Sequence, residues 1–415
     1  MSTISVMAKE RSKLPDGWRW VRLGEVTRVA SGSTPRSGVE EYWDDDIVWI
    51  TPTDLGKLNS REIFTSDRRI TKAGYQSCGT ELVPPGSVVM SSRAPIGHLG
   101  IACVRLCTNQ GCKSFVPGPD VDSEFLYFTL KQSVPILQTM GSGATFAEVS
   151  KSTVEDFEIP LPPLGEQKRI AAILNEQTAA VERAGAAAEA QLEAAKALPA
   201  AYLRQVFPQS GQELPAGWHW VRLGEVCEIN PRRPELARKD DSLTTFVPMS
   251  AVDERLGTIV RAETKPFGQV RKGYTYFEDC DVLFAKITPC MQNGKHAIAR
   301  NLVGGFGFGT TEFHVLRRGP AVIPDWIHFF IRQPEVLENA KAHFTGAVGQ
   351  QRVPETYLAE LEISLPPVDE QKRIAAMLNE QMASAERARK AIEEELDGIN
   401  KLPAALLRRA FNGEL

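Results

Sequence analysis

Cysteines and a histidine are the first residues here whose types could do chemistry together. Four of them fall within one short stretch: His98, Cys103, Cys107 and Cys112. Their spacing does not fit a zinc knuckle, and no two cysteines form a CxxC pair. The total of seven cysteines is odd, which argues against a disulfide framework. We therefore expect reduced, structural thiols in preference to a zinc cluster.

Motifs of nucleotide binding and covalent catalysis are absent from the sequence. It contains no GxxxxGK[ST] phosphate loop, no GxSxG nucleophile elbow and no HExxH zinc site. We interpret the glycine-rich stretch 304–309 as a turn, because it does not open a helix after a strand. Asn230 in "NPRR" lacks the second proline and the aromatic residue of an amino-methyltransferase motif. The sequence therefore predicts a chain that is not itself an enzyme.

The strongest feature of the sequence is a repetition. "LPDGWRWVRLGEV" from Leu14 returns from Leu214 as "LPAGWHWVRLGEV", with two changes in thirteen positions. A longer block from Leu161, "LPPLGEQKRIAAILNEQ", returns from Leu365 as "LPPVDEQKRIAAMLNEQ". A third motif, "LPAAYLRQVF" from Leu198, returns as "LPAALLRRAF". Because solenoid repeats are much shorter, this order indicates a tandem duplication of a unit of about 200 residues, with a near-circular, pseudo-two-fold organisation.

The longer repeated blocks have the composition of helices. Each follows a Pro-Pro pair, is rich in alanine and glutamate, has Asp or Glu in its first turn and carries further arginines late, as the helix dipole favours. We expect Asp369 to cap the second helix. Apolar residues recur every seven positions, as in a coiled-coil seam: Leu174, Val181, Ala188 and Ala195 in the first block, and Leu378, Ala385, Ile392 and Ile399 in the second. We expect the helices to pair antiparallel; the alternative is two amphipathic helices, each packed on its own domain.

The segments between the repeated blocks have a different pattern. Residues 14–160 and 214–364 contain short runs of Val, Ile and Phe separated by Gly and Pro, which predicts strands and turns. "SEFLYFTLKQ" from Ser123 and "PDWIHFFIRQ" from Pro324 predict one helix at the same place in each. The predicted fold class is α+β, with two β-rich globules separated by two long helices. The expected domains are residues 1–160, 161–207, 208–364 and 365–415.

Bulk properties set few limits. The formal net charge of −4 is a mild argument against a stand-alone, non-specific nucleic-acid binder, which would usually be basic. The sequence contains no run of eighteen apolar residues, so it predicts no membrane span. The first thirteen residues lack the apolar core of a signal peptide, so we expect a cytoplasmic protein with no membrane partner.

Several stretches resemble a known family. "LPxGW…LGE", "SGSTPRSGVEEYWDDDIVWITPTDL", "SSRAPIG" and "EIPLPPLGEQKRIAAIL" are similar to the specificity (S) subunits of type I restriction–modification systems, over nearly the whole chain. The resemblance implies two target-recognition domains, each reading one half of a bipartite, asymmetric site in double-stranded DNA. It also implies that the paired helices act as a spacer and dock two methyltransferase (M) subunits, which restriction (R) subunits then join.

The same resemblance implies where cofactors belong. No cofactor is expected in this chain, S-adenosylmethionine is expected on the methyltransferase partner, and ATP and magnesium are expected on the restriction partner. Two other functions compete with this one: a stand-alone sequence-specific DNA-binding protein, and a coiled-coil scaffold that binds proteins only. Neither of them would need a methyltransferase partner.

Candidate DNA-binding residues are polar side chains in loops, because such side chains reach base edges. In the first globule we expect contacts from Thr51, Thr53, Ser91, Ser92, Arg93, Asn109, Gln110 and Thr145. In the second we expect contacts from Lys286, Gln292, Asn293, Lys295, Thr310, Thr311, Gln350, Gln351 and Arg352. Lys286 is expected near the equivalent of Arg93. For each residue the alternative is a solvated side chain or a turn-forming hydrogen bond.

Two further sets of repeated residues concern packing and partners. Trp18 and Trp20 alternate, as do Trp218 and Trp220, so the members of each pair point to opposite faces of a strand. We expect them to be packing anchors where a globule meets the helices, in preference to stacking on bases. Four basic residues near the helix starts mark a partner-binding face or are simply solvated: Lys168, Arg169, Lys372 and Arg373.

Overall fold

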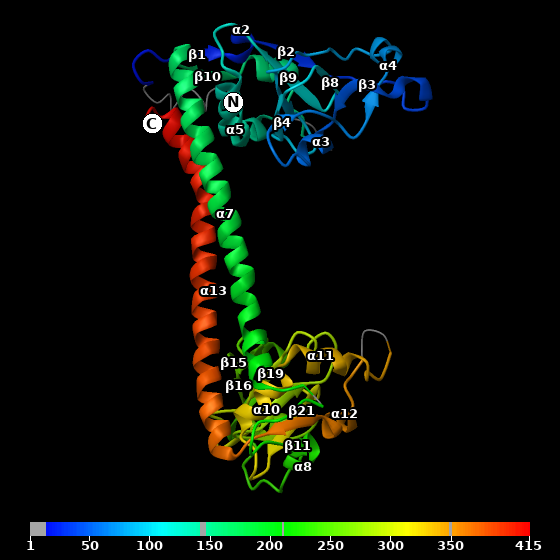
Figure 1. Cartoon of the computed structure of the whole chain (residues 1–415), viewed down its shortest axis with the longest axis vertical. Coiled ribbons are helices and arrows are strands. Elements are labelled where there is room, and N and C mark those ends of the chain that lie inside the picture. Colours follow the sequence, from blue (N-terminus) through cyan, green and yellow to red (C-terminus); the bar gives the residue numbers. More distant parts are fainter. Residues whose placement is uncertain (1–13, 142–146, 210, 348–350) are drawn as a thin grey trace. The chain divides into compact units, whose positions relative to one another are not determined.

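The computed structural model describes residues 14–141, 147–209, 211–347 and 351–415, which form two compact units (Figure 1). Unit 1 comprises Met1–Glu189 and Glu395–Leu415, and unit 2 comprises Ala190–Glu394. Each unit therefore combines one globule with the first part of one long helix and the last part of the other. None of the helices among the described residues is both long enough and apolar enough to cross a membrane.

The globule of unit 1 contains two sheets. The larger has the strand order β2 (Thr27–Ser31), β9 (Cys112–Pro117), β6 (Val88–Ser91), β7 (Leu99–Ala102) and β4 (Glu62–Ile63). The smaller has the order β5 (Arg69–Ile70), β3 (Trp43–Ile50) and β8 (Leu106–Thr108). The predicted helix is α5 (Ser123–Met140), which begins after the N-cap Asp122 and contacts β6 and β7 of the larger sheet.

The globule of unit 2 repeats this plan. One sheet has the order β12 (Cys227–Ile229), β21 (Phe313–Arg318), β18 (Val282–Ala285) and β19 (His296–Ile298). The other has the order β16 (Glu263–Pro266), β13 (Leu243–Val247), β20 (Phe306–Gly309) and β17 (Thr275–Glu278). A hairpin of β14 (Val252–Asp253) and β15 (Thr258–Ile259) lies near β19, and the predicted helix is α10 (Pro324–Ile331). The predicted α+β class with two β-rich globules is confirmed.

Matching strand pairs define which residues of the two globules are equivalent. Ser91 pairs with Cys112 between β6 and β9, and Ala285 pairs with Phe313 between β18 and β21. In each globule the second of these sheets also joins two parallel strands, β3 with β8 and β13 with β20. The glycine-rich stretch 304–309 enters β20 after two glycines of positive φ, so it is a turn and strand as predicted.

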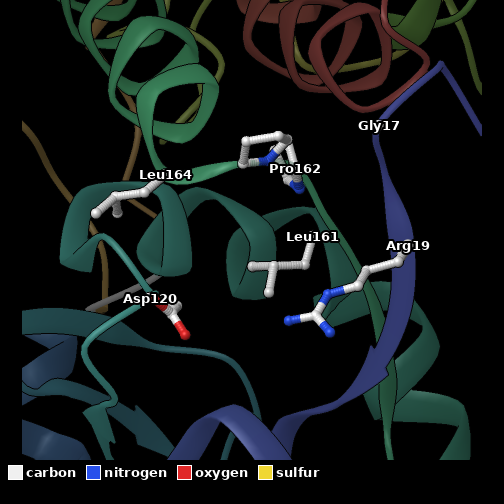
Figure 2. Close-up of a pocket in the computed structure, with 7 residues that line it drawn as sticks. Gly17, Arg19, Asp120, Leu161, Pro162 and Leu164 are labelled. Carbon is white, nitrogen blue, oxygen red and sulfur yellow. The ribbon is translucent and has the colours of Figure 1, made fainter.

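The repeated motifs meet each other in space and form the frame of each unit. β1 (Arg19–Arg22) pairs antiparallel with β10 (Glu158–Leu161), and β11 (His219–Arg222) pairs in the same register with β22 (Glu362–Leu365). Figure 2 shows the first of these pairs, with Arg19 extending over Leu161 beside the start of the long helix. Gly24, which is shared by both copies of the first motif, lies in α2 (Leu23–Val26). A Cβ at this position would lie 3.0 Å from the Glu155 Cβ, so a larger residue would crowd Glu155.

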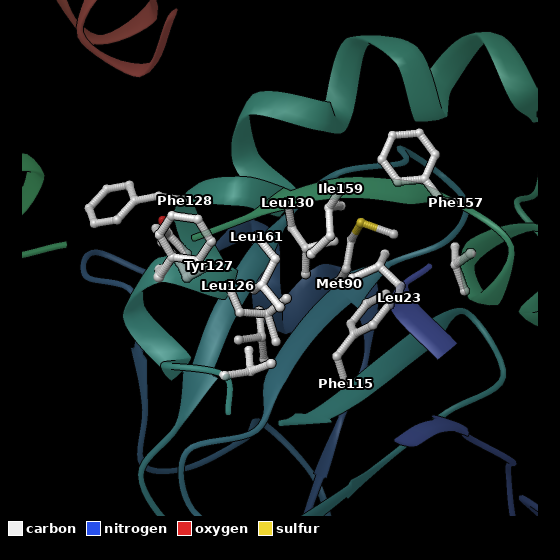
Figure 3. Packing of buried hydrophobic residues seen from close by; sticks show 14 of the residues in the cluster. Leu23, Met90, Phe115, Leu126, Tyr127, Phe128, Leu130, Phe157, Ile159 and Leu161 are labelled. Carbon is white, nitrogen blue, oxygen red and sulfur yellow. The ribbon is translucent and has the colours of Figure 1, made fainter. Parts of the chain in front are cut away.

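The largest hydrophobic cluster of unit 1 lies where the globule meets the helices (Figure 3). Met90 and Phe115 of the larger sheet pack with Leu126 and Leu130 of α5 and with Leu161 of β10. Trp18 packs against Phe125 in this core and Trp218 packs against Trp326 in unit 2, with ring centroids 6.5 and 5.6 Å apart. Trp18 and Trp218 are packing anchors, as predicted. The same prediction is wrong for Trp20, which lies on the other side of the chain and is 36% exposed, while Trp220 is half-buried.

The long helices are α7 (Leu164–Val206) and α13 (Val368–Phe411), and within each unit they run antiparallel. In unit 1, Ile170 and Leu174 near the start of α7 share a core with Leu407 near the end of α13. In unit 2, Leu378 near the start of α13 shares a core with Leu203 near the end of α7. The seam residues Leu174, Ala188 and Ala195 are buried, as are Leu378 and Ala385. Antiparallel pairing is therefore confirmed, and the alternative, in which each helix packs only on its own domain, is wrong.

One helix boundary differs from the prediction. α13 begins at Val368, so Asp369 lies inside the first turn and is not the N-cap. Its side chain is 96% exposed and forms an ion pair with Lys372. Gln371 does the anchoring instead: it is fully buried, donates to Ala321 O and Pro366 O at 2.8 Å, and accepts from Ile323 N at 3.0 Å. Gln167 makes the equivalent three bonds in unit 1.

Candidate nucleic-acid interface

Most of the residues predicted to contact DNA in the first globule lie at one end of its larger sheet, which we call edge 1 (residues 91–93, 109–111 and 148). Ser92 N donates to Gly111 O at 2.8 Å, and Val149 N donates to Ser92 O at 3.0 Å. These bonds hold the loop after β6 against the β8–β9 turn and against the segment that contains Glu148. The turn itself is closed by Gly111 N, which donates to Asn109 Oδ1 at 2.9 Å. The structure therefore brings these sequence-distant loops together.

Two of the edge 1 predictions are wrong as direct base contacts. Ser91 and Ser92 are completely buried. The Ser91 hydroxyl donates to Pro95 O at 2.7 Å and accepts from His98 N at 2.9 Å, so it is used inside the loop. The Ser92 hydroxyl accepts from Lys113 Nζ at 3.3 Å. Both serines shape the loop, while Arg93 remains partly exposed and Gln110 is exposed.

A buried lysine at the centre of edge 1 escaped the sequence analysis. The Lys113 side chain is 6% exposed and its Nζ lies 3.4 Å from a Glu148 carboxylate oxygen, while the Glu148 side chain is 39% exposed. Arg93 approaches the same carboxylate at 3.9 Å. A lysine in the middle of the apolar run "GCKSFVP" was the available signal, because buried lysines require a partner. Edge 1 thus presents two cations around one carboxylate.

The remaining predictions in the first globule have mixed outcomes. Thr51 lies beside the β8–β9 turn, because Asn109 N donates to Ile50 O at 2.9 Å. Its side chain caps α3 (Pro52–Gly56) and accepts from Asp54 N at 3.3 Å, which is the turn-forming alternative. Thr53 is exposed on α3. Thr145 lies outside the described residues.

In the second globule the equivalent surface, edge 2, consists of residues 285–287, 310–312 and 351–352. Lys286 N donates to Glu312 O at 2.9 Å, and Val353 N donates to Lys286 O at 2.9 Å. Ser92 makes the same two backbone bonds in edge 1, so Lys286 is equivalent to Ser92. The sequence predicted it near the equivalent of Arg93, which is the next residue along the chain. Thr288 N donates to Gln351 O at 3.0 Å, which brings Gln351 to this edge.

Arg352 is held in a fixed orientation by Glu312. Its Nε and Nη2 donate to the two carboxylate oxygens of Glu312, both at 2.8 Å, and the arginine side chain is 40% exposed. The hydrogen bonds from Arg352 hold the pKa of Glu312 below its ordinary value. Together with Lys286, edge 2 again presents two cations around one carboxylate, although the residues at each position differ. By the matching backbone bonds, Gly111 is replaced by Glu312 and Glu148 by Arg352.

The other predicted residues of the second globule separate into exposed and engaged groups. Gln292 and Asn293 are exposed on the turn that follows Pro289. Lys295 turns away from this surface: its Nζ donates to Val252 O at 2.8 Å and lies 3.5 Å from Glu254, so the prediction of a base contact is wrong for it. The Thr310 hydroxyl accepts from Glu312 N at 3.3 Å, and Thr311 is exposed. Gln350 lies outside the described residues.

Histidine, cysteine and carboxylate side chains of the described residues are the candidates for metal ligands. Over the described part of the chain, no three of the His, Cys, Asp and Glu side chains are grouped so as to hold a metal ion. Burial raises the pKa of Cys112 to about 12, and the seven cysteines are free thiols. The hollow shown in Figure 2, about 210 Å³ in volume, lies between Arg19, Asp120 and the Pro162–Leu164 turn. It is a gap at the globule–helix junction that lacks a nucleophile and base in reach of each other.

Five of the exposed residues of each long helix that are identical in the two copies lie toward one side of the helix, and we call them the shared stripe. Its members in α7 are Lys168, Arg169, Ala172, Glu176 and Arg183, and those in α13 are Lys372, Arg373, Ala376, Glu380 and Arg387. Positions 172, 176 and 183 are four and seven residues apart, so they lie on one helix face. Arg169 and Arg373 each form ion pairs within their helix, with Glu166 and Glu370. The core explains none of these identities, since all ten residues are exposed.

Comparison with known proteins agrees with the duplicated organisation. A family model described as "Type I restriction modification DNA specificity domain" matches residues 15–192 and 215–396, one match for each copy. The type I restriction enzyme MjaIX specificity subunit of Methanocaldococcus jannaschii is 33% identical over 229 residues, which are 52% of this chain and 53% of that protein. The EcoEI specificity subunit of Escherichia coli is 37% identical over 196 residues, which are 47% of this chain and 33% of that protein. The chain thus spans about half, or a third, of these relatives.

Longer but weaker similarity covers nearly the whole chain. The type I restriction enzyme StySPI specificity subunit of Salmonella potsdam is 21% identical over 432 residues, which are 98% of this chain and 90% of that protein. Among solved structures, the HsdS subunit from Thermoanaerobacter tengcongensis has a TM-score of 0.65 at 23% identity and covers 99% of this chain and all of that one. A structure from work on complex assembly of the type I R-M system has a TM-score of 0.72 at 23% identity, covering 97% and 100%. These structures share the fold.

Proposed function

The chain belongs to the family of type I restriction–modification DNA specificity domains, and we propose that its two globules read the two halves of one bipartite, asymmetric DNA sequence. The observation that carries the proposal is the contrast between frame and edge. The β1–β10 and β11–β22 frames have the same register, and matching backbone bonds define edge 1 and edge 2. At those edges, however, the side chains differ in size and sign. Two readers with the same frame and different edges suit an asymmetric site.

Within this proposal the direct contacts come from the exposed members of each edge. Arginine and lysine read guanine, glutamine and asparagine read adenine, and carboxylates accept from cytosine. Edge 1 offers Arg93, Gln110 and the partly exposed Glu148, whereas edge 2 offers Lys286 and the oriented guanidinium of Arg352. Gln292, Asn293 and Thr311 extend the second surface. Phosphate contacts by partner subunits would offset the net charge of −4.

We further propose that α7 and α13 form a spacer and that each shared stripe docks one methyltransferase subunit. The support is that exposed residues stayed identical in both copies, while the surfaces of the globules diverged. Two identical surfaces on antiparallel helices suit two identical partners related by a pseudo-two-fold axis. α7 contains 43 residues and is therefore roughly 65 Å long at 1.5 Å per residue, long enough to separate two half-sites.

The chemistry in such a complex would belong to the partners. This chain is proposed to be non-catalytic, with S-adenosylmethionine bound by the methyltransferase subunits and ATP and magnesium by restriction subunits. The test is co-expression with a type I methyltransferase subunit from the same host, followed by sequencing of methylated bases in the host DNA. We expect a stable complex and methylated adenines in a single bipartite sequence. No complex and no sequence-specific methylation would overturn the proposal.

A domain exchange tests the modular part of the proposal. Replacing residues 14–160 by those of a relative with a different target should change one half of the methylated sequence and leave the other half as it was. A change in both halves would contradict independent readers. Specific DNA binding by the chain alone would favour the stand-alone DNA-binding protein. An absence of DNA binding even with the methyltransferase subunit present would favour the protein scaffold.

A further inference from the structure

Each unit contains a polar bridge between its globule and its long helix, in addition to the apolar core. In unit 1, Arg61 Nη1 lies 3.2 Å from Glu124 Oε2 and also donates to Asn175 Oδ1. Asn175 Nδ2 lies 3.5 Å from the same Glu124 oxygen. Arg61 belongs to the globule, Glu124 to the first turn of α5, and Asn175 to α7. The three side chains therefore join three separate elements.

Unit 2 contains a corresponding set of an arginine, a carboxylate and an asparagine, in which both the arginine and the asparagine contact the carboxylate. Arg300 Nη2 donates to Asp325 Oδ2 at 2.8 Å, and Asn379 Nδ2 lies 3.5 Å from Asp325 Oδ1. Asn379 holds in α13 the position that Asn175 holds in α7, within the repeated "LNEQ" sequence. Asp325 of α10 is equivalent to Glu124 of α5, because the residues two positions earlier, Ile323 and Asp122, make the same backbone bond to a buried glutamine.

The arginines of the two bridges, by contrast, come from segments that are not equivalent. Arg61 precedes β4, and its carbonyl accepts from Ile101 N at 2.7 Å, so it arrives beside β7 from a separate loop. Arg300 lies two residues after the end of β19, and by the strand register its counterpart in unit 1 is Cys103. In the two globules, arginines from segments that are not equivalent therefore pair with carboxylates at equivalent positions. Common descent alone does not explain that outcome, whereas a shared requirement does.

Stability alone is a weak explanation for such a bridge. Partly exposed ion pairs contribute little to stability, and asparagine inside a helix is less favourable than alanine. The apolar core stabilises each junction but does not depend on direction. Hydrogen bonds do depend on direction, so they can hold an angle that apolar contacts leave loose. In unit 2 these hydrogen bonds border a cavity of about 300 Å³, lined by Arg300, Asp325 and Asn379. Apolar side chains therefore do not fill the junction at this point.

We propose that Arg61–Glu124–Asn175 and Arg300–Asp325–Asn379 are positioning residues that hold each recognition globule at a defined angle to its helix, and so determine which spacing of half-sites is accepted. The inference rests on the proposed function. One added base pair moves a half-site by about 3.4 Å and turns it by roughly a tenth of a turn. A globule on a rigid junction cannot reach the displaced half-site, whereas a globule on a flexible junction can.

The experiment uses the complex with the methyltransferase and a set of duplexes whose spacer differs by one or two base pairs. We expect the unchanged complex to prefer one spacer by about tenfold or more. Asn379→Ala should bring the neighbouring spacers to within about threefold of it, with unchanged discrimination against wrong bases in each half-site. The exchange D325N with N379D keeps one amide and one carboxylate at the bridge and should restore the preference. Asn400→Ala, an exposed asparagine of the same helix, is the matched control.

A second measurement does not depend on DNA. Spin labels introduced as non-natural amino acids at the exposed Gln292 and Ser384 report the distance between the globule and α13 within unit 2. The distribution should broaden in Asn379→Ala and narrow again in the exchange variant. An unchanged distribution and spacer preference would overturn the inference, as would an equal loss of binding to every spacer. A wild-type complex that binds no specific DNA would defeat the proposed function, while the labels would still decide whether the bridge holds the angle.

Discussion

Phe411 of α13 packs against Phe125 of α5 with ring centroids 5.5 Å apart. In unit 2 the equivalent rings are Phe207, which directly follows α7, and Trp326 of α10, at 4.5 Å. The chain runs on from Phe207 to Trp218, which packs on the same Trp326 ring. In unit 1 the same cluster is closed by residues from opposite parts of the sequence, Phe411 and Trp18. The order of structural units is therefore circular.

A circularly permuted chain should assemble like the original. The proposed permutant starts at Pro208 and joins Leu415 to Leu14 through a short glycine–serine linker, since Pro15 already adjoins Gly413. We expect its free energy of unfolding to differ by roughly 1 kcal/mol or less, because linker length affects loop closure only weakly. Denaturant unfolding and methyltransferase binding measure the result. A chain opened at Gly100, inside β7, is the control that should fail, and equal failure of both would contradict the circular organisation.

Acid should destabilise unit 2 through His328. Burial lowers the pKa of this histidine from 6.5 to about 3, with the neighbouring Arg332 and Arg300 acting in the same direction and a bond to His296 O opposing it. Since the folded pKa is depressed, protonation favours the unfolded chain, and stability is lost as the pH falls below about 6.5. Between pH 7 and pH 5 the loss amounts to about 2 kcal/mol for this group.

The variant His328→Tyr tests this pH dependence, because tyrosine occupies the equivalent position, Tyr127, in unit 1. Thermal or denaturant unfolding at pH 7 and pH 5 should show a smaller acid-induced loss for the variant than for the unchanged chain. His219→Arg places the residue of the first copy at an exposed site and should keep the full loss. Equal losses in all three proteins would rule out His328 as a source.

The buried lysine of edge 1 should depend on its carboxylate. Glu148→Gln leaves Lys113, 6% exposed, without its charged partner, and we expect about 1–2 kcal/mol of destabilisation given that Glu148 is itself partly exposed. Adding Lys113→Met should recover part of that loss, since no unpaired charge then remains buried. A double-mutant cycle by denaturant unfolding measures the coupling. Additive effects of the two changes would show that the pair does not interact.

The shared stripe makes a prediction about stoichiometry. Ala172→Arg places a long charged side chain on the stripe of α7, and Ala376→Arg does the same on α13. Each single variant should bind one methyltransferase subunit in place of two, and the double variant none, as measured by native mass spectrometry. Gln191→Arg places the same side chain at an exposed position of α7, eight residues after Arg183 and about 80° round the helix from it, and should bind two. Two bound subunits in the double variant would place the docking surface elsewhere.

Much of the architecture could be predicted because its signals are local or repeated. The heptad spacing of Leu174 and Ala188 identified the helix seam, and the duplicated "LPxGW" and "EQKRIA" motifs identified two equivalent units. Strands such as β6 and β18 were visible as short apolar runs between turn residues. Asp369 was assigned wrongly as a cap, because the choice between adjacent positions at a helix start depends on where the preceding prolines end.

The sequence by itself thus determined the duplication, the antiparallel helix pair and the β-rich class of each globule. Only the tertiary structure decided which polar residues share a surface. It turned Ser91, Ser92 and Lys295 inward, brought Lys113 to Glu148 and Arg352 to Glu312, and placed Arg61 and Arg300 on equivalent carboxylates. The physical reason is that heptads and turns follow from bonds between near neighbours in sequence. Side-chain partners across strands depend on register and burial, which only the completed packing of distant segments sets.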